Sequence, residues 1–188
     1  MKYLTGISLF ILLVAFDASG EQRTPYKTDV EPSKLPLSVL IETNRGSFEI
    51  EFFRELAPIT VLNFTYLADK KLLENFIFGA VRQGEVVQGG DPPNKETAAK
   101  FNWSVPAEFS ATKHVRGSVG MRRSPSFINP ERRSHPTQFY ITLTRYQHLD
   151  GMYTVFGQVS SGMNVVEALQ QGDRIVSVKL PKNYNMGF

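Results

Sequence analysis

The sequence predicts a mainly β domain that closes, or nearly closes, into a barrel plugged by helices. Short apolar runs recur along the chain between Gly, Pro, Asn and Asp, a hairpin pattern precedes them, and only two segments have helical periodicity. Many short strands with few helices are typical of all-β barrels. With 188 residues, the chain has room for one domain and a short leader.

The first 20 residues have the layout of a secretory signal peptide. Lys2 gives a positive start, an apolar run extends from Leu4 to Phe16, and the small residues at 18–20 resemble a cleavage site. This run is shorter than the ~20 residues that span a bilayer, and an uncleaved anchor is the alternative. We therefore expect an exported protein, periplasmic or extracellular, that is not bound to a membrane after cleavage.

The rest of the chain divides into three parts. Prolines among polar residues at 21–37 predict a flexible lead-in. The folded domain is expected over residues 38–181, followed by a C-terminal tail at 182–188. We find no internal repeat and no low-complexity tract in it.

The domain is expected to open with a hairpin and a helix. Residues 39–43 and 48–52 each alternate between apolar or β-branched and polar side chains, with Asn44-Arg45-Gly46 between them. Pro58 suits the first turn of a helix, and residues 61–67 give that helix a broad apolar face. Further strands are predicted near 86–87, 118–121, 139–143, 153–159 and 175–180, and a second helix at 164–170 that stops at Gly172. The strand order does not follow from the pattern.

Composition excludes several kinds of site. The chain has no cysteine, which rules out disulfides, thiolate zinc sites and a cysteine nucleophile. His114, His135 and His148 lack the spacing of metal ligands, so we expect no metal and no cofactor. The net charge of +3 argues weakly at best for nucleic acid, and we expect no nucleic-acid partner. The stretch from Lys100 to Pro136, which contains the basic insert 122–136, has a net charge of +5. Without interleaved aromatic residues it favours a solvated basic surface, with an acidic partner, a nucleic acid or an anionic cell-envelope polymer as the alternatives.

Seven segments resemble the cyclophilin family of peptidyl-prolyl isomerases and occur in the family's order. One such segment would be weak evidence, but seven in order are strong. They are TNRGSF at 43–48, APITVLNF at 57–64, VVQGGDP at 86–92, PAEF at 106–109, RGSVGM at 116–121, TQFYI at 137–141 and LDGMYTVFG at 149–157. The insert INPERRS at 128–134 is similar to that of bacterial secreted members.

The resemblance implies a closed eight-stranded antiparallel barrel capped by two α-helices, and an enzyme that interconverts cis and trans X–Pro bonds. Rotation about such a bond meets a barrier of ~18–20 kcal/mol, because amide resonance must be broken. The enzyme must therefore bind the twisted amide more tightly than either planar form. In the family, an apolar socket holds the proline ring, and an arginine donates a hydrogen bond near the prolyl nitrogen.

The strand at 78–91 departs from the family at the catalytic position. Counted back without a gap from QGGD at 88–91, Ala80 stands where the family has its arginine. Glu85 replaces a socket phenylalanine and Val86 a methionine, whereas Gln88 matches a carbonyl-binding glutamine. Because loss of one preorganised donor costs other enzymes ~10²–10³ in rate, the resemblance implies weak activity here.

Most of the other groove positions match. The resemblance assigns substrate binding to Val86, Gln88, Met121, Gln138, Tyr140, His148, Leu149 and Tyr153. His148 replaces a tryptophan common in the family, which together with Glu85 argues against cyclosporin binding. Arg122 occupies a place usually held by alanine, so Glu85 and Arg122 are two charged departures in one expected pocket.

Two compensations are compatible with these residues. Arg82 lies two residues from Ala80, so on a strand both side chains project from the same face, ~6.5 Å apart along the backbone. Arg82 is thus a possible substitute for the missing arginine, or it binds a carboxylate or solvent at the surface. The second hypothesis is that Glu85 and Arg122 form an ion pair that fills or re-tunes the proline pocket.

We interpret the chain as a monomeric, exported cyclophilin-type peptidyl-prolyl isomerase of weak activity that acts on proline-containing segments of client proteins. The alternative is a non-catalytic peptide-binding or chaperone module on the same fold. Ala80 and Glu85 favour the module, whereas Gln88, Gln138 and Tyr153 favour retained peptide binding.

Overall fold

The computed structural model describes residues 24–184 and residue 188, so the signal peptide predicted for residues 1–20 lies outside the described residues. In chain order the elements are η1 (Pro32–Lys34), β1 (Ser38–Thr43), β2 (Gly46–Phe52), α1 (Pro58–Asp69), β3 (Ala80–Arg82), β4 (Val86–Gly89), α2 (Lys95–Ala98), β5 (Ser118–Met121), β6 (Phe139–Thr142), η2 (Gln147–Leu149), β7 (Val155–Ser161), α3 (Met163–Ala168) and β8 (Ile175–Lys179). Within the described residues, no helix is long and apolar enough to cross a bilayer.

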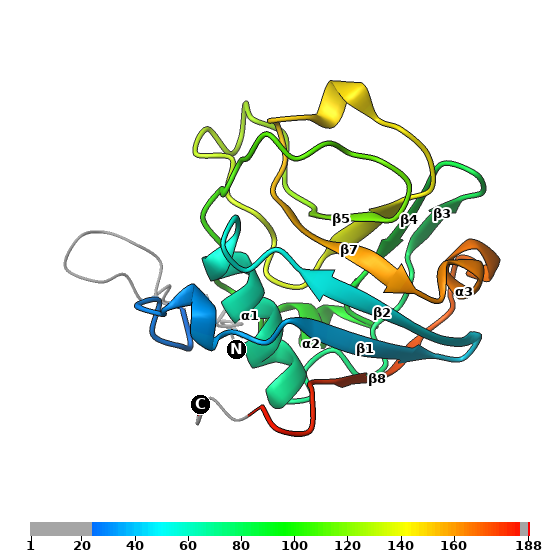
Figure 1. The fold of residues 1–188 in the computed structure, drawn as a ribbon, viewed down its shortest axis with the longest axis horizontal. Coiled ribbons are helices and arrows are strands. Elements are labelled where there is room, and N and C mark those ends of the chain that lie inside the picture. The colour runs from blue at the N-terminus through cyan, green and yellow to red at the C-terminus, as the bar shows by residue number, and fades with distance from the viewer. Residues whose placement is uncertain (1–23, 185–187) are drawn as a thin grey trace, which may run out of the picture.

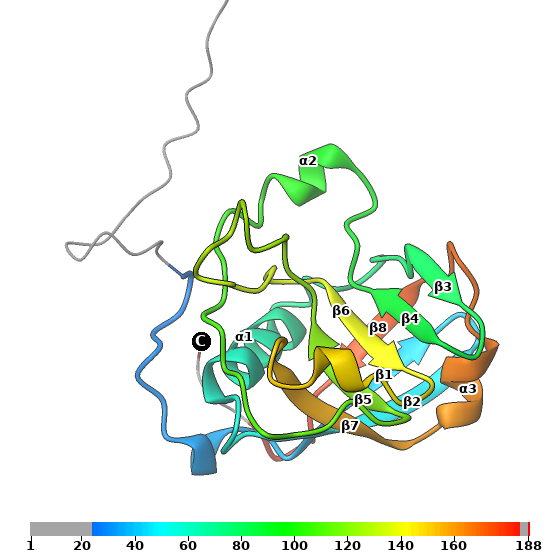
Figure 2. The same ribbon diagram turned by 90° about the horizontal axis from the view of Figure 1, so that it is seen from above.

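The eight strands form one curled antiparallel sheet in the order β3-β4-β6-β5-β7-β2-β1-β8 (Figure 1). The predicted closed barrel is not confirmed, because β3 and β8 remain the two ends of this order. Near the gap, Ile77 makes single bridges to Asp91 and Arg174, which do not extend into a ladder. A third helix, the four-residue α2, adds to the two predicted ones and projects from the sheet (Figure 2).

The predicted hairpin forms where the alternation places it. β1 and β2 pair in register up to Thr43 opposite Gly46, which leaves Asn44 and Arg45 as a two-residue turn. Gly46 has φ +127°, a backbone conformation that side chains with a Cβ disfavour. The glycine in the sequence motif therefore has a conformational reason to stand at the start of β2.

A remote carboxylate completes the start of α1. Pro58 lacks an N–H, which the first turn of a helix does not need. The next two backbone N–H groups, of Ile59 and Thr60, donate to the Glu108 carboxylate at 2.9 and 2.8 Å. Negative charge is favourable at a helix N-terminus, so Glu108 ties the loop before β5 to the helix.

The core forms between α1 and the inner face of the sheet. The Phe64 ring of α1 packs against Phe52, Phe139 and Phe156, with ring centroids 5.8, 5.7 and 5.5 Å apart. Aromatic pairs in this range add to the free energy gained by burial alone. One helix is thereby joined to β2, β6 and β7.

The buried side chain of Asn63 joins three further segments to α1. Its Oδ1 accepts hydrogen bonds from the Tyr26 hydroxyl at 2.8 Å and Trp103 Nε1 at 3.0 Å, and its Nδ2 donates to the Pro136 carbonyl at 2.6 Å. The described part of the predicted lead-in is therefore tied to the domain at Tyr26. Tyr26 and Leu35 are buried in the core, and their burial offsets the entropy lost by ordering this part of the chain.

Replacement of Asn63 by alanine should lower the free energy of unfolding by about 3 kcal/mol, because three buried polar groups lose their partner. Urea denaturation measures this change. Asn164→Ala, at an exposed position of α3, should change stability by no more than about 0.5 kcal/mol. Equal losses in the two variants would show that the Asn63 contacts add no stability.

Candidate functional site

One row of paired residues crosses four neighbouring strands. Ala80 of β3 pairs with Gln88 of β4, Gln88 pairs with Tyr140 of β6, and Tyr140 pairs with Gly120 of β5. Directly paired residues in antiparallel strands project from the same face of a sheet. The register thus places the Ala80 methyl group, the Gln88 amide and the Tyr140 ring on one face.

A pocket of about 260 Å³ lies on this face. Arg82, Val86 and Thr142 form a second paired row beside the first, and all three contribute to the pocket. The remaining wall comes from the segment after β5 and from the loop between β6 and β7. The lining residues are Arg82, Val86, Gln88, Arg122, Arg123, Tyr140, Thr142, Tyr146, His148, Leu149 and Tyr153.

The pocket brings together most of the residues that the sequence singled out, and their role in binding substrate stays a prediction. Those that line it are Val86, Gln88, Tyr140, His148, Leu149, Tyr153, Arg82 and Arg122. Sequence reasoning missed Arg123, Thr142 and Tyr146. Thr142 had a usable signal, because it follows Tyr140 by two residues on a strand. Tyr146 lies in a loop, where no periodicity marks it.

Met121 and Gln138 do not line the pocket. Met121 is fully buried in the core, because Gly120 faces the pocket side of β5 and the next side chain points the other way. Gln138 precedes β6, and its Nε2 donates to Asp91 Oδ1 at 2.5 Å. Met121 packs in the core, and Gln138 is hydrogen-bonded to Asp91.

Glu85 lies outside the pocket, contrary to its alignment with a socket residue. It follows Gly84 in the turn between β3 and β4, and its side chain is 52% exposed. Its carboxylate lies 3.4 Å from Arg82 Nη1 and accepts a hydrogen bond from the Tyr146 hydroxyl at 3.1 Å. A turn position lets the charge stay in water, so no carboxylate is buried in an apolar socket.

The hypothesis of a Glu85–Arg122 ion pair is wrong. Among the described residues, Glu85 pairs with Arg82, whereas Arg122 Nη1 lies 3.6 Å from Asp91 Oδ1. The pocket is therefore not filled by a salt bridge between Glu85 and Arg122.

The Tyr140 ring is fixed by its neighbours. A Cβ at Gly120 would collide with this ring, so the glycine provides the space in which it lies. The ring stands edge-on to Tyr153, with centroids 6.0 Å apart and planes at 86°. The Arg123 guanidinium lies 4.5 Å from the centroid of Tyr153, close enough for a cation–π interaction.

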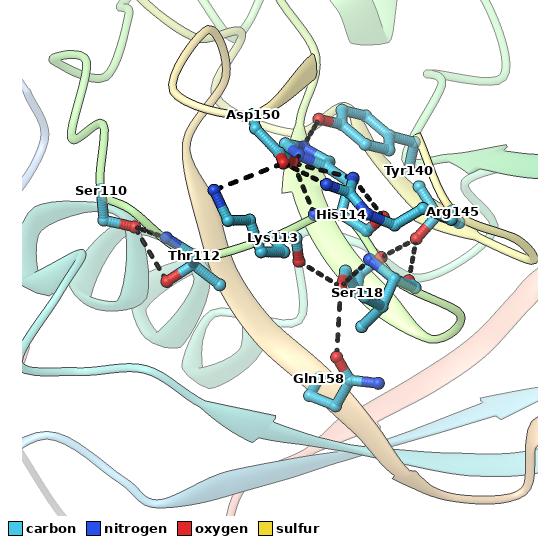
Figure 3. Close-up of polar contacts among 11 residues, drawn as sticks. Ser110, Thr112, Lys113, His114, Ser118, Tyr140, Arg145, Asp150 and Gln158 are labelled. Atoms are coloured by element: carbon cyan, nitrogen blue, oxygen red, sulfur yellow. Dashed lines mark hydrogen bonds and ion pairs between the residues drawn. The ribbon is translucent and has the colours of Figure 1, made fainter. Parts of the chain in front are cut away.

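A buried histidine holds the Tyr140 hydroxyl (Figure 3). His114 Nε2 lies 2.8 Å from that hydroxyl, and His114 Nδ1 lies 3.1 Å from Asp150 Oδ1. Arg145 forms hydrogen bonds to both carboxylate oxygens of Asp150. The four side chains form a continuous hydrogen-bonded chain from the surface to the back of the pocket.

The protonation states in this chain follow from burial and charge. Burial lowers the pKa of His114 and raises the pKa of Tyr140. Hydrogen bonds from Arg145 and the His114 backbone hold the pKa of Asp150 well below its usual range. A neutral His114 that donates from Nδ1 to the Asp150 carboxylate must accept a hydrogen bond from the Tyr140 hydroxyl at Nε2. Tyr140 therefore presents a ring to the pocket with its hydroxyl already paired.

The arrangement can hold an apolar ring and one or more peptide carbonyls. Val86, Leu149 and Tyr153 supply apolar surface, and Gln88 supplies an amide donor. At the row position beside Gln88, Ala80 contributes no polar atom. Among the described residues, no cluster of three His, Asp or Glu side chains is placed to hold a metal ion.

Comparison with known proteins agrees with this geometry. Residues 38–185 match the family model described as cyclophilin type peptidyl-prolyl cis-trans isomerase/CLD. A peptidyl-prolyl cis-trans isomerase of Synechococcus elongatus is 33% identical over 75% of this chain and 94% of its own length. One from Helicobacter pylori is 34% identical over 73% of this chain and 83% of its own length.

Solved structures show the same fold. A cyclophilin type peptidyl-prolyl cis-trans isomerase of Cryptosporidium parvum superposes with a TM-score of 0.66 at 22% identity, over 79% of this chain and 99% of its own. The same protein crystallised in the presence of the dipeptide Ala-Pro gives a TM-score of 0.65, over 78% of this chain and 99% of its own.

Stability should decrease in mild acid because the His135 side chain is partly buried and lies near the Arg122 charge, which disfavours its protonated form. A hydrogen bond from the His135 backbone N–H to the Arg122 carbonyl connects the two residues. Burial, and then the Arg122 charge, lowers the pKa of His135 from 6.5 to about 4. The unfolded chain therefore takes up this proton first, and the free energy of unfolding should fall between pH ~6.5 and ~4, by up to ~3 kcal/mol from this group. Urea denaturation across this range should show a flatter pH dependence for His135→Gln. The exposed His148, replaced in the same way, is the control, and identical slopes in all three proteins would contradict the assignment.

Proposed function

The chain belongs to the cyclophilin-type peptidyl-prolyl cis-trans isomerase family, and from this we propose that it binds proline-containing segments of exported client proteins and isomerises their X–Pro bonds slowly. The observation that carries the proposal is the pocket on the β3-β4-β6 face, which Gln88 lines together with the apolar side chains Val86 and Leu149 and the rings of Tyr140 and Tyr153. Uncatalysed isomerisation takes tens to hundreds of seconds, so even slow catalysis would help a client to fold.

The walls of the pocket suit a proline ring. Val86, Tyr140, Leu149 and Tyr153 offer apolar contact, and the Tyr140 hydroxyl is satisfied by His114. No unpaired polar group of that ring opposes the entry of an apolar ligand. Gln88 remains available to donate to a carbonyl of the bound segment.

Slow turnover follows from Ala80. A donor near the prolyl nitrogen stabilises the twisted amide, in which that nitrogen regains its lone pair. A methyl group in this row cannot donate. The substrate would thus be held in place without the interaction that favours its transition state over its ground state.

Arg82 is the cation best placed to supply part of that interaction. It lines the pocket on the same face as Ala80 and Gln88, and its side chain is 65% exposed. Glu85 Oε2 lies 3.4 Å from its Nη1, and a guanidinium has five N–H donors, so donors remain for a ligand. We assign the residual catalysis to Arg82.

A non-catalytic peptide-binding or chaperone module is the second candidate, and the methyl group at position 80 is the observation that favours it. Such a module would use the same pocket and bind the same segments. It differs from the first candidate in one respect, because binding would occur without turnover.

Export is part of the proposal and rests on residues 1–20. Their charged start, apolar run and small-residue end are typical of a secretory leader. The clients would then be proteins that fold outside the cytoplasm. We propose that the mature protein meets them as a monomer.

The wild-type protein should accelerate cis–trans isomerisation of an Ala-Pro peptide measurably, and Arg82→Ala should lower kcat/KM by roughly tenfold. This is less than the ~10²–10³ expected for a preorganised donor, because the Arg82 side chain is 65% exposed and partly engaged by Glu85. Lys179→Ala, which removes an exposed cation from β8, is the control and should keep wild-type activity. Peptide binding without turnover in the wild type would establish the second candidate instead, and absence of both would refute the proposed function.

Ala80→Arg should raise kcat/KM at least about tenfold, because it returns a donor to the row that contains Gln88. No second substitution at Glu85 is needed, since that side chain lies outside the pocket. The measurement is the same isomerisation assay, with Ala80→Gln as a control of similar polarity and no charge. Equal rates for wild type and both variants would show that position 80 does not limit turnover.

A further inference from the structure

The pocket is lined by three arginines, and none of its lining residues is an aspartate or a glutamate. We propose that it selects proline-containing segments that carry an acidic side chain next to the proline. This inference rests on the proposed function and adds a substrate class to it. The arginines are Arg82, Arg122 and Arg123, and the anionic group is a side-chain carboxylate of the client.

The three cations reach the pocket from two separate parts of the chain. Arg82 ends β3, at one end of the strand order, whereas Arg122 and Arg123 follow β5. They converge on the same cavity as the apolar side chains Val86 and Leu149. A ligand that satisfies this lining must therefore combine an apolar group with a negative charge close to it.

The carboxylates of the chain neutralise these arginines only in part. Glu85 contacts Arg82 at 3.4 Å, and Asp91 contacts Arg122 at 3.6 Å, each outside the pocket lining and longer than a normal charge-assisted hydrogen bond. The Arg82 and Arg122 side chains remain 65% and 47% exposed. Both keep donors that an incoming carboxylate can use.

Arg123 has no carboxylate partner among the described residues. Its guanidinium donates to the Ser124 and Met152 carbonyls and to the Ser126 hydroxyl. It also lies over the face of Tyr153, a wall of the pocket. These contacts hold the charge next to the apolar surface without cancelling it.

The ligand is expected to be a peptide carboxylate because of the size and composition of the pocket. A cavity of about 260 Å³ holds one or two side chains, not a folded surface. A planar guanidinium matches a carboxylate through two parallel hydrogen bonds. Arg82 already contacts one carboxylate, that of Glu85 at the edge of the pocket. Glu85 would therefore compete with the client carboxylate for the Arg82 guanidinium.

The test compares three peptides that share an Ala-Pro centre and carry Glu, Gln or Lys beside the proline, on either side in separate series. Acetylated and amidated ends remove the terminal charges. Calorimetric Kd values for the wild-type protein should be roughly fivefold to tenfold lower for Glu than for Gln, and highest for Lys. This ratio should shrink between about 0.01 M and 1 M ionic strength, as the Debye length falls from ~30 to ~3 Å.

Variants assign the preference to individual residues through the Glu-to-Gln affinity ratio, which is insensitive to a general loss of binding. Arg122→Gln combined with Arg123→Gln should lower the ratio, and the further replacement Arg82→Gln should bring it close to one. Glu85→Gln should raise it, because the competitor of Arg82 is removed. Lys179→Gln, which removes a cation that does not line the pocket, should leave it unchanged. Thermal unfolding confirms that each variant is folded.

The outcomes distinguish a failure of this inference from a failure of the proposed function. Equal Kd values for the Glu and Gln peptides overturn the inference and leave the proposed function standing, since the neutral peptide still binds. A ratio that is unchanged in the variant lacking all three arginines also overturns it. Failure of all peptides to bind overturns both proposals.

Discussion

The register of four antiparallel strands is the constraint on which the pocket depends. Because side chains alternate between the two faces of a sheet, a slip of one residue would turn Gln88 and Tyr140 inward and bring Val87 and Ile141 to the pocket. Val87 and Ile141 are almost completely buried, and exposing such side chains costs about 25 cal/mol per Å² of apolar surface. The core behind the sheet therefore specifies which groups a ligand meets on the other side.

Sequence reasoning succeeded where periodicity or a glycine reports local geometry. The hairpin around Gly46, the helix that begins at Pro58 and the face shared by Arg82 and Ala80 all follow from such signals. It failed where a side chain's surroundings depend on distant segments. Glu85 aligns with a socket residue but lies in a turn, and the partner of His114 is Asp150, 36 residues later. The docking of Tyr26 on Asn63 is likewise a long-range contact that no local pattern contains.

The shape of the pocket and its catalytic chemistry depend on different residues in this family. The features that shape the pocket involve many residues at once, including Gly120 beneath the Tyr140 ring and the His114–Asp150 support behind it. Under the proposed function, the catalytic feature depends on a single side chain, so the methyl group at position 80 would remove it and leave the fold intact. Positive charge is still present, but at the rim, on Arg82, Arg122 and Arg123. Such an arrangement favours recognition of a ligand over acceleration of its rotation.

The docking of Tyr26 fixes the side from which the chain enters the domain. In Figure 1 and Figure 2 the segment that follows residue 24 runs along the side opposite β3 and β4. Anything attached upstream of residue 24 is thus joined to the domain away from the strands that carry Arg82 and Gln88. A form tethered to a membrane through its N-terminus and a form released by cleavage would therefore both leave the pocket on the β3-β4 face accessible to an unfolded chain.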